Sequence, residues 1–177
     1  MGRFAKVAFT PSVRAMQERM GSRPAYARIE AGDEPDALGE AEAEFIAERD
    51  SFYMASVGET GWPYIQHRGG PKGFVRVLDA HTLGFADYRG NRQYVSVGNV
   101  ARDDRVALIF VDYREPARLK VLARATIVTA DDDPKALERL VDAAYGAHVE
   151  RGFLLRVEGF DWNCPQHITP RPPLGSP

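Results

Sequence analysis

The sequence of 177 residues has little of several features that mark particular classes of protein. A single cysteine, Cys164, excludes a disulfide framework within the chain and is typical of a reducing compartment. No apolar run approaches the length that spans a membrane, and residues 1–9 lack the apolar core of a secretory signal. The sequence therefore predicts a cytoplasmic protein with no membrane as partner.

Charge of one sign does not dominate either. The 23 basic and 25 acidic residues give a formal net charge of -2 and are mixed along the chain, which gives no reason to propose a nucleic acid as partner. With 44% hydrophobic residues the chain is long enough to bury one core. We expect a single domain over residues 1–177, with a helical extension at 1–50, a barrel at 51–160 and a strap at 161–177.

Metal ligands are also sparse. Cys164 and His167 form a lone C-x-x-H pair, whereas the other three histidines are scattered on different predicted elements. A zinc site needs four ligands brought together. The sequence therefore predicts no metal centre.

The N-terminal extension contains two predicted helices separated by a loop. Thr10 followed by a proline suits a helix start, and we expect this helix to pack on the main body through Val13, Met16 and Met20. Residues 23–38, rich in Pro, Gly and Asp, predict a surface loop. A second helix is predicted over residues 40–49, with its apolar residues Phe45 and Ile46 turned inward and its glutamates outward.

Strands dominate the rest of the chain. Apolar or alternating stretches predict them at residues 52–57, 62–67, 74–78, 83–86, 105–113, 118–129 and 153–160. A helix is predicted from Pro134, with Leu137, Leu140, Val141 and Ala144 on one stripe, and the proline-rich residues 161–177 predict an extended strap. Tight turns between most strands exclude a doubly wound parallel sheet and favour a small antiparallel barrel of about six strands.

The clearest functional signal lies between Leu83 and Val111. A short strand is followed by the polar turn 87–90, and a helix is predicted to begin near Asn91. The first N–H groups of a helix lack partners, and the helix dipole adds partial positive charge there. Arg89 and Arg92 would add donors, so this pattern predicts a phosphate site. An ordinary helix start whose arginines lie in water fits the same residues.

Three blocks in order carry a family resemblance: MASVGETGWPYIQHRGG, then VLDAHTLGFADYRGNRQYVSVGNVARDDRVALIFV, then ARLKVLARATIV. They resemble the pyridoxamine 5′-phosphate oxidase-like family of FMN-binding split barrels, over residues 45–128 with a weaker echo in the strap. The resemblance implies a mainly β fold, namely a six-stranded antiparallel split β-barrel with flanking helices. It also implies a homodimer with one FMN in each of two clefts at the subunit interface.

Carried over by position, the resemblance assigns FMN contacts to several blocks. The residues that would run along the flavin ring and ribityl chain are Gln66, His67, Arg68, Gly69, Ala86 and Asp87. Those at or near the phosphate are Asn91, Arg92 and Gln93, with Arg89 or Arg68 compensating for the family lysine that Gln93 replaces. Those near the ring or reaching it from the dimer partner are Arg118, Trp162 and Arg171.

Catalysis is less clearly marked than binding. His67 adjoins the proposed ring and is a candidate proton donor, although a structural histidine of the barrel fits as well. The residues that hold the substrate phosphate in true pyridoxamine 5′-phosphate oxidases do not align: the lysine position falls on Pro71 or Lys72, and residues 134–151 are predicted as a plain helix. Oxidation of vitamin B6 is therefore the least supported activity.

Three hypotheses about function stay open on the sequence. The leading one is an FMN-dependent oxidoreductase acting on a small molecule. The second is a flavin- or haem-binding stress or sequestration protein without efficient turnover. The third is a deazaflavin (F420) reductase on the same scaffold. The sequence names neither the substrate nor the electron donor and acceptor.

Overall fold

The computed structural model describes residues 2–30 and 33–171. Its helices are α1 (Gly2–Ala8), α2 (Pro11–Arg19), α3 (Arg23–Ala27), α4 (Glu40–Ala47), α5 (Val95–Arg102) and α6 (Pro134–Glu138). Its strands are β1 (Ser51–Val57), β2 (Pro63–Gly69), β3 (Val75–Asp79), β4 (Thr82–Tyr88), β5 (Arg105–Asp112), β6 (Ala117–Val128) and β7 (Val149–Asn163). Within these residues no helix is long and apolar enough to cross a membrane.

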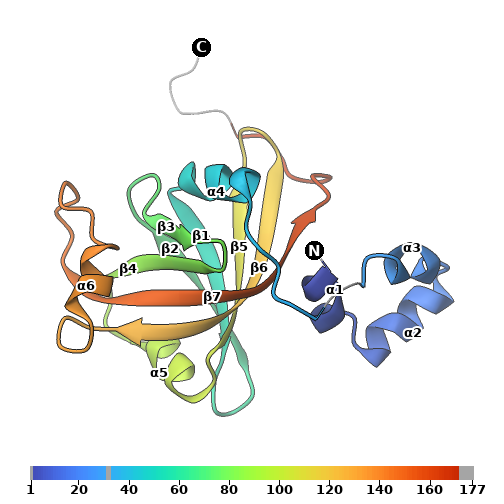
Figure 1. Ribbon diagram of the computed structural model, residues 1–177, viewed down its shortest axis with the longest axis horizontal. Helices are drawn as coiled ribbons and strands as arrows, with labels where there is room; N and C mark the ends of the chain where they lie inside the picture. The colour runs from blue at the N-terminus through green and yellow to red at the C-terminus, as the bar shows by residue number, and fades with distance from the viewer. Residues whose placement is uncertain (1, 31–32, 172–177) are drawn as a thin grey trace.

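The strands form one antiparallel seven-stranded sheet in the order β2-β1-β5-β6-β7-β4-β3, with β2 and β3 at its edges (Figure 1). Over the described part of the chain the sheet curls without closing. The predicted class, an antiparallel split barrel with flanking helices, is confirmed. The sheet has seven strands where the resemblance implied six, and they coincide with the seven stretches marked by the sequence pattern.

Phenylalanine rings fill the centre of the barrel. On β1 the side chains alternate, so that Phe52 and Met54 are buried while Tyr53 is exposed. Neighbouring rings of the cluster have centroids 5.0 to 6.4 Å apart, and the cluster consists of Phe52, Phe74, Phe85, Phe110 and Phe153. Burying each such side chain stabilises the fold by roughly 1.5–3 kcal/mol, so this cluster is the main apolar support of the site described below.

The N-terminal helices differ from the prediction in two respects. Residues 23–38 contain the short helix α3 and are therefore not all loop. Helix α2 forms where predicted but packs on α3, and both project from the barrel (Figure 1). The expected packing on the main body is wrong, because Met20 is 72% exposed and Met16 48%. The spacing of the apolar residues therefore predicted the helix α2 correctly, but it did not predict which part of the protein packs against them.

Helix α1 is the part of this extension that is fixed to the barrel. The Asp36 carboxylate accepts hydrogen bonds from the backbone N–H groups of Phe4 (3.1 Å) and Phe160 (3.2 Å), which ties α1 to β7. At Gly159 a Cβ atom would lie 2.6 Å from the Phe4 backbone nitrogen. Only glycine allows α1 to approach β7 this closely.

Helix α4 packs Ile46 fully into the core, as predicted. The prediction that its glutamates all face outward is wrong for Glu42, which is buried. Its carboxylate accepts a hydrogen bond from the Gly39 backbone N–H at 2.8 Å and another from Trp162 Nε1 at 2.6 Å. Glu42 therefore both caps α4 and joins it to the end of β7.

The helix predicted from Pro134 is much shorter than expected. Helix α6 ends at Glu138, and the predicted continuation toward residue 151 is wrong because β7 begins at Val149. Val149, Arg151 and Gly152 pair with β4, and the register shifts at Glu150, which lies between them. Leu140 is buried over the outer side of β4 and β7, so the apolar stripe reflects packing of one turn and not of a long helix.

The strap is described only as far as Arg171. The Arg171 backbone N–H donates to the Tyr113 carbonyl at 2.7 Å, and its guanidinium lies 4.3 Å from the Tyr113 ring centroid. This holds the strap beside the β5–β6 turn. The rest of the predicted strap, residues 172–177, lies outside the described residues.

Candidate functional site

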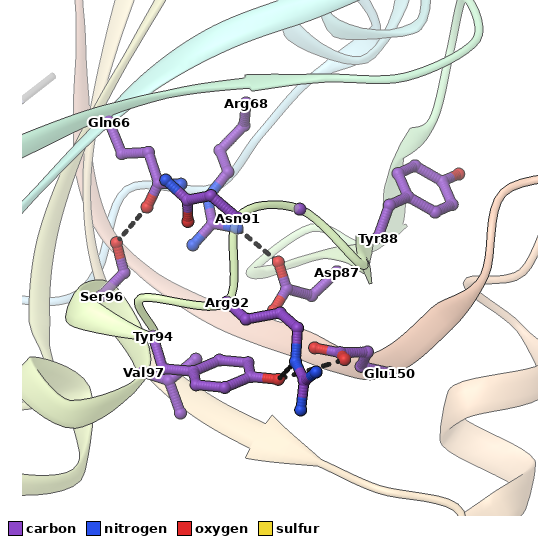
Figure 2. A pocket seen from close by; sticks show the side chains of 11 residues that line it. Gln66, Arg68, Asp87, Tyr88, Asn91, Arg92, Tyr94, Ser96, Val97 and Glu150 are labelled. Carbon is purple, nitrogen blue, oxygen red and sulfur yellow. Dashed lines mark hydrogen bonds and ion pairs between the residues drawn. The ribbon is translucent and has the colours of Figure 1, made fainter.

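Two adjoining hollows lie at the seam of the barrel, where β2 faces β4. One has a volume of about 220 Å³ and the other about 240 Å³. The lining residues that they share are Gln66, Arg68, Asp87, Tyr88 and Gly90. The hollows therefore form one continuous depression. Arg68 and Asp87, which line both hollows, form an ion pair (Figure 2).

The two faces of β2 serve different surroundings. Gln66 and Arg68 turn toward the seam, and the Ser96 hydroxyl donates to Gln66 Oε1 at 2.9 Å (Figure 2). His67 alternates to the outer face, where it is exposed and its ring meets Tyr53 edge to face, with centroids 5.4 Å apart. The imidazole of His67, the candidate proton donor, therefore lies at the rim of the depression, on the opposite face of β2 from the side chains of Gln66 and Arg68.

Asp87 is the most constrained charge at the seam. Besides its ion pair with Arg68, its Oδ2 lies 3.5 Å from Arg151 Nε. Burial raises the pKa of Asp87, and the two arginines oppose this shift without cancelling it. The Arg68 guanidinium also lies 5.3 Å from the Phe153 ring centroid, so it joins the seam to the apolar core.

The turn after β4 is longer than predicted. Helix α5 begins at Val95 and not near Asn91, because the backbone of Arg92 (φ 62°) and Tyr94 (φ 54°) is left-handed. Asn91 Oδ1 accepts from the Gln93 backbone N–H at 3.2 Å and forms a turn of its own. The first turn of α5 has no side-chain cap, and it follows a loop that presents Asn91 and Arg92 to the hollow.

Glu150, at the start of β7, is a residue of this site that the sequence analysis missed. Its Oε1 accepts hydrogen bonds from Arg89 Nε (3.0 Å) and the Tyr94 hydroxyl (3.2 Å), and its Oε2 accepts from Arg151 Nη2 (2.8 Å). Partial burial raises the pKa of Glu150, but the bonds from Arg89 and Tyr94 outweigh this and leave the pKa below its ordinary value. No local motif marks Glu150, since it reaches the site through the pairing of β7 with β4.

Most of the residues assigned by sequence come together at the seam. Those that line one hollow or the other are Gln66, His67, Arg68, Gly69, Ala86, Asp87, Arg89, Asn91 and Arg92. Gln93 lies next to them in the exposed loop, outside the lining of either hollow. They come from β2, from β4 and from the loop between β4 and α5. Strand β3 and the turns on either side of it separate β2 from the other two segments in the sequence.

The other three assigned residues lie elsewhere on the chain. Arg118 Nη2 donates to the Cys164 carbonyl at 2.9 Å, Trp162 is bonded to Glu42, and Arg171 stacks on Tyr113. Trp162 is at the opposite end of β7 from Glu150. One chain therefore does not bring these three side chains to its own seam.

The chain is similar to known proteins both in sequence and in fold. The sequence model of the pyridoxamine 5′-phosphate oxidase family matches residues 38–164. No curated protein sequence matches the chain. Structural neighbours include HupZ of Group A Streptococcus, with 16% identity, a TM-score of 0.57 and coverage of 76% of this chain and 99% of that one.

Two further solved structures are similar. A candidate pyridoxamine 5′-phosphate oxidase of Lactobacillus delbrueckii has 23% identity, a TM-score of 0.54 and coverage of 71% and 94% of the two chains. An FMN-binding protein of Syntrophomonas wolfei has 10% identity, a TM-score of 0.53 and coverage of 86% and 95%. At such identities these structures show a common fold and no more. The family match spans β1 to β7 and every residue that lines the seam, and the chain belongs to the pyridoxamine 5′-phosphate oxidase family.

Proposed function

We propose that the protein binds FMN at the seam between β2 and β4 and acts as an FMN-dependent oxidoreductase on a small molecule. One observation supports this most directly. Residues assigned to the flavin from separate blocks of sequence line one depression, around Arg68 and Asp87.

The donor set fits a phosphate. Arg89, Arg92 and Asn91 lie together in the loop before the uncapped first turn of α5. Arg68 adds a buried Nε that has no hydrogen-bond partner among the described residues. The neighbouring hollow, lined partly by Phe74 and Phe85, suits a flat ring. When bound, FMN would supply the hydride chemistry, and the chain would orient it.

The depression is incomplete in one chain, which supports a homodimer. The three residues that the resemblance assigns near the flavin or to the dimer partner, Arg118, Trp162 and Arg171, lie away from the seam of their own chain. The outer face of β1, β2, β5 and β6 carries exposed apolar side chains, among them Ile65 on the edge strand β2, which is 64% exposed. Hollows of about 400 and 180 Å³ lie along this face and are lined by both apolar and charged residues. Two copies joined through this face would let Arg118, Trp162 or Arg171 of one reach the flavin of the other.

Replacing Arg92 by Ala tests the phosphate site. Loss of this guanidinium should weaken FMN binding about tenfold, the scale of a charge-assisted hydrogen bond, as measured by quenching of FMN fluorescence. Arg114→Ala, in the exposed β5–β6 turn, is the matched control and should bind FMN as the unmodified protein does. Equal affinity in the Arg92 variant would contradict the proposed role.

A second measurement distinguishes an oxidoreductase from a protein that only binds and stores the flavin. The FMN-loaded protein would be mixed with NADH or NADPH in the absence of oxygen, and the flavin absorption followed. Bleaching supports an oxidoreductase that takes electrons from a nicotinamide. A flavin that stays oxidised with every nicotinamide and reduced small molecule tried would favour a cofactor-sequestering protein instead.

A further inference from the structure

Glu150 places a carboxylate inside the proposed phosphate site. Four guanidinium groups and two carboxylates surround the seam, namely Arg68, Arg89, Arg92, Arg151, Asp87 and Glu150. Asp87 is joined to Arg68 and Arg151, which support the barrel itself. Glu150 differs, because it holds side chains that the phosphate is expected to use.

The contacts of Glu150 reach both arginines of the loop. Its Oε1 accepts directly from Arg89 Nε at 3.0 Å. The same oxygen accepts from the Tyr94 hydroxyl at 3.2 Å, and that hydroxyl in turn accepts from Arg92 Nε at 3.3 Å (Figure 2). One carboxylate oxygen is therefore linked to Arg89 in one step and to Arg92 in two.

We propose that Glu150 is an internal counter-ion that competes with the ligand's phosphate for Arg89 and Arg92. It thereby sets how strongly the site prefers a phosphorylated flavin over the same flavin without a phosphate. This inference rests on the proposed FMN site. Without a ligand, Glu150 keeps the clustered guanidinium groups neutralised and oriented; with a ligand, its negative charge opposes the phosphate.

The variant Glu150→Gln tests the negative charge of this side chain while keeping its size and position. Glutamine keeps an oxygen that can accept from Arg89 and Tyr94, but it removes the negative charge. The variant should bind FMN about tenfold more tightly than the unmodified protein, the scale of removing one like charge a few ångströms from a phosphate at a partly solvated site. Its affinity for riboflavin, which lacks the phosphate, should not change.

Glu30→Gln is the matched control. Glu30 follows α3 and also pairs with two arginines, Arg14 at 3.0 Å and Arg23, but it lines neither the hollows of the seam nor those of the outer face. The variant removes an equal charge from a position that is likewise paired with arginines. Its affinities for FMN and riboflavin should both match those of the unmodified protein.

The experiment measures the dissociation constants of FMN and riboflavin for each variant by fluorescence quenching. A ratio of riboflavin to FMN constants that rises in Glu150→Gln and not in the control variant supports the inference. Tyr94→Phe, which breaks the link from Glu150 to Arg92 but keeps the ring, should raise the ratio by less. An unchanged or lower ratio in Glu150→Gln overturns the inference, whereas failure of the unmodified protein to bind either flavin overturns the proposed function.

Discussion

Arg68 on β2 and Asp87 on β4 form an ion pair across the open seam of the barrel, between strands that are not neighbours in the sheet. Both side chains are largely buried, and Arg68 also lies over the Phe153 ring. Side chains thus join two strands that are not linked by backbone hydrogen bonds. Both residues of the pair line both hollows, so the pair links the stability of the barrel to the shape of the site.

Replacing Arg68 by Met should destabilise the protein by about 2–3 kcal/mol. The change leaves Asp87 buried with Arg151 as its remaining charged partner, which makes the loss smaller than the roughly 3–5 kcal/mol of a fully isolated buried charge. The measurement is the free energy of unfolding in urea, without FMN.

The double variant Arg68→Met with Asp87→Leu provides the comparison. It removes both charges and places apolar side chains against Phe85 and Phe153, so it should recover much of the lost stability. Arg151 keeps Glu150 as a partner in that variant. A double variant less stable than the single one would show that the ion pair itself, and not the isolated carboxylate, determines stability.

The strands could be predicted because their evidence is local. Side chains alternate between the faces of a strand, so a pattern such as that of residues 52–57 predicts both the strand and its buried face. The family resemblance, carried by the three blocks in order, assigned to one site most of the residues that meet at the seam, although Gln66 and Asp87 lie on different strands. At Gly70 a Cβ would lie 2.7 Å from Phe74 Cγ, so glycine there allows the chain after β2 to pack on the apolar core.

The start of α5 and the role of Glu150 could not be predicted because they depend on each other across the fold. Tyr94 adopts a left-handed backbone, and its hydroxyl reaches Glu150, 56 residues further along the chain. Helix propensity places Glu150 on the continuation of α6, whereas pairing with β4 draws it into a strand. A tertiary interaction overrode the local preference at both ends of this contact.

Gly159→Ala should release α1 from the barrel. The added Cβ would lie 2.6 Å from the Phe4 nitrogen and 2.8 Å from its Cα, and backbone cannot yield as a flexible side chain can. We expect α1 to move away, which breaks the Asp36 bonds to its first turn. Trypsin should then cleave after Lys6 much faster, while the thermal unfolding of the barrel changes little.

Gly98→Ala is the control for that experiment. A Cβ at this position in α5 meets no atom within 4 Å, and alanine is favoured over glycine in a helix by about 1 kcal/mol. The variant should be slightly more stable and should show the cleavage rate of the unmodified protein. Rapid cleavage in neither variant would mean that β7 can shift to admit the methyl group.

Ile65→Asp should convert the proposed homodimer into monomers. Ile65 is 64% exposed on the edge strand β2 of the outer face and pairs across the strands with Ala55. In a two-fold interface the substitution introduces two aspartates, one from each copy, into an apolar contact. Dimer affinity should fall by at least about a hundredfold, as measured by light scattering of the protein separated by size over a dilution series.

The FMN affinity of the same variant tests whether the cleft is shared between the two copies. If Trp162 or Arg171 of one copy completes the flavin site of the other, monomeric Ile65→Asp should lose most of its FMN binding although the seam around Arg68 is intact. Val141→Asp, which puts the same charge on a residue 39% exposed after α6, should stay dimeric and keep FMN. A monomeric Ile65→Asp that retains full FMN affinity would show that one chain suffices for binding, and the assignment of the three distant residues to the partner's site would fall.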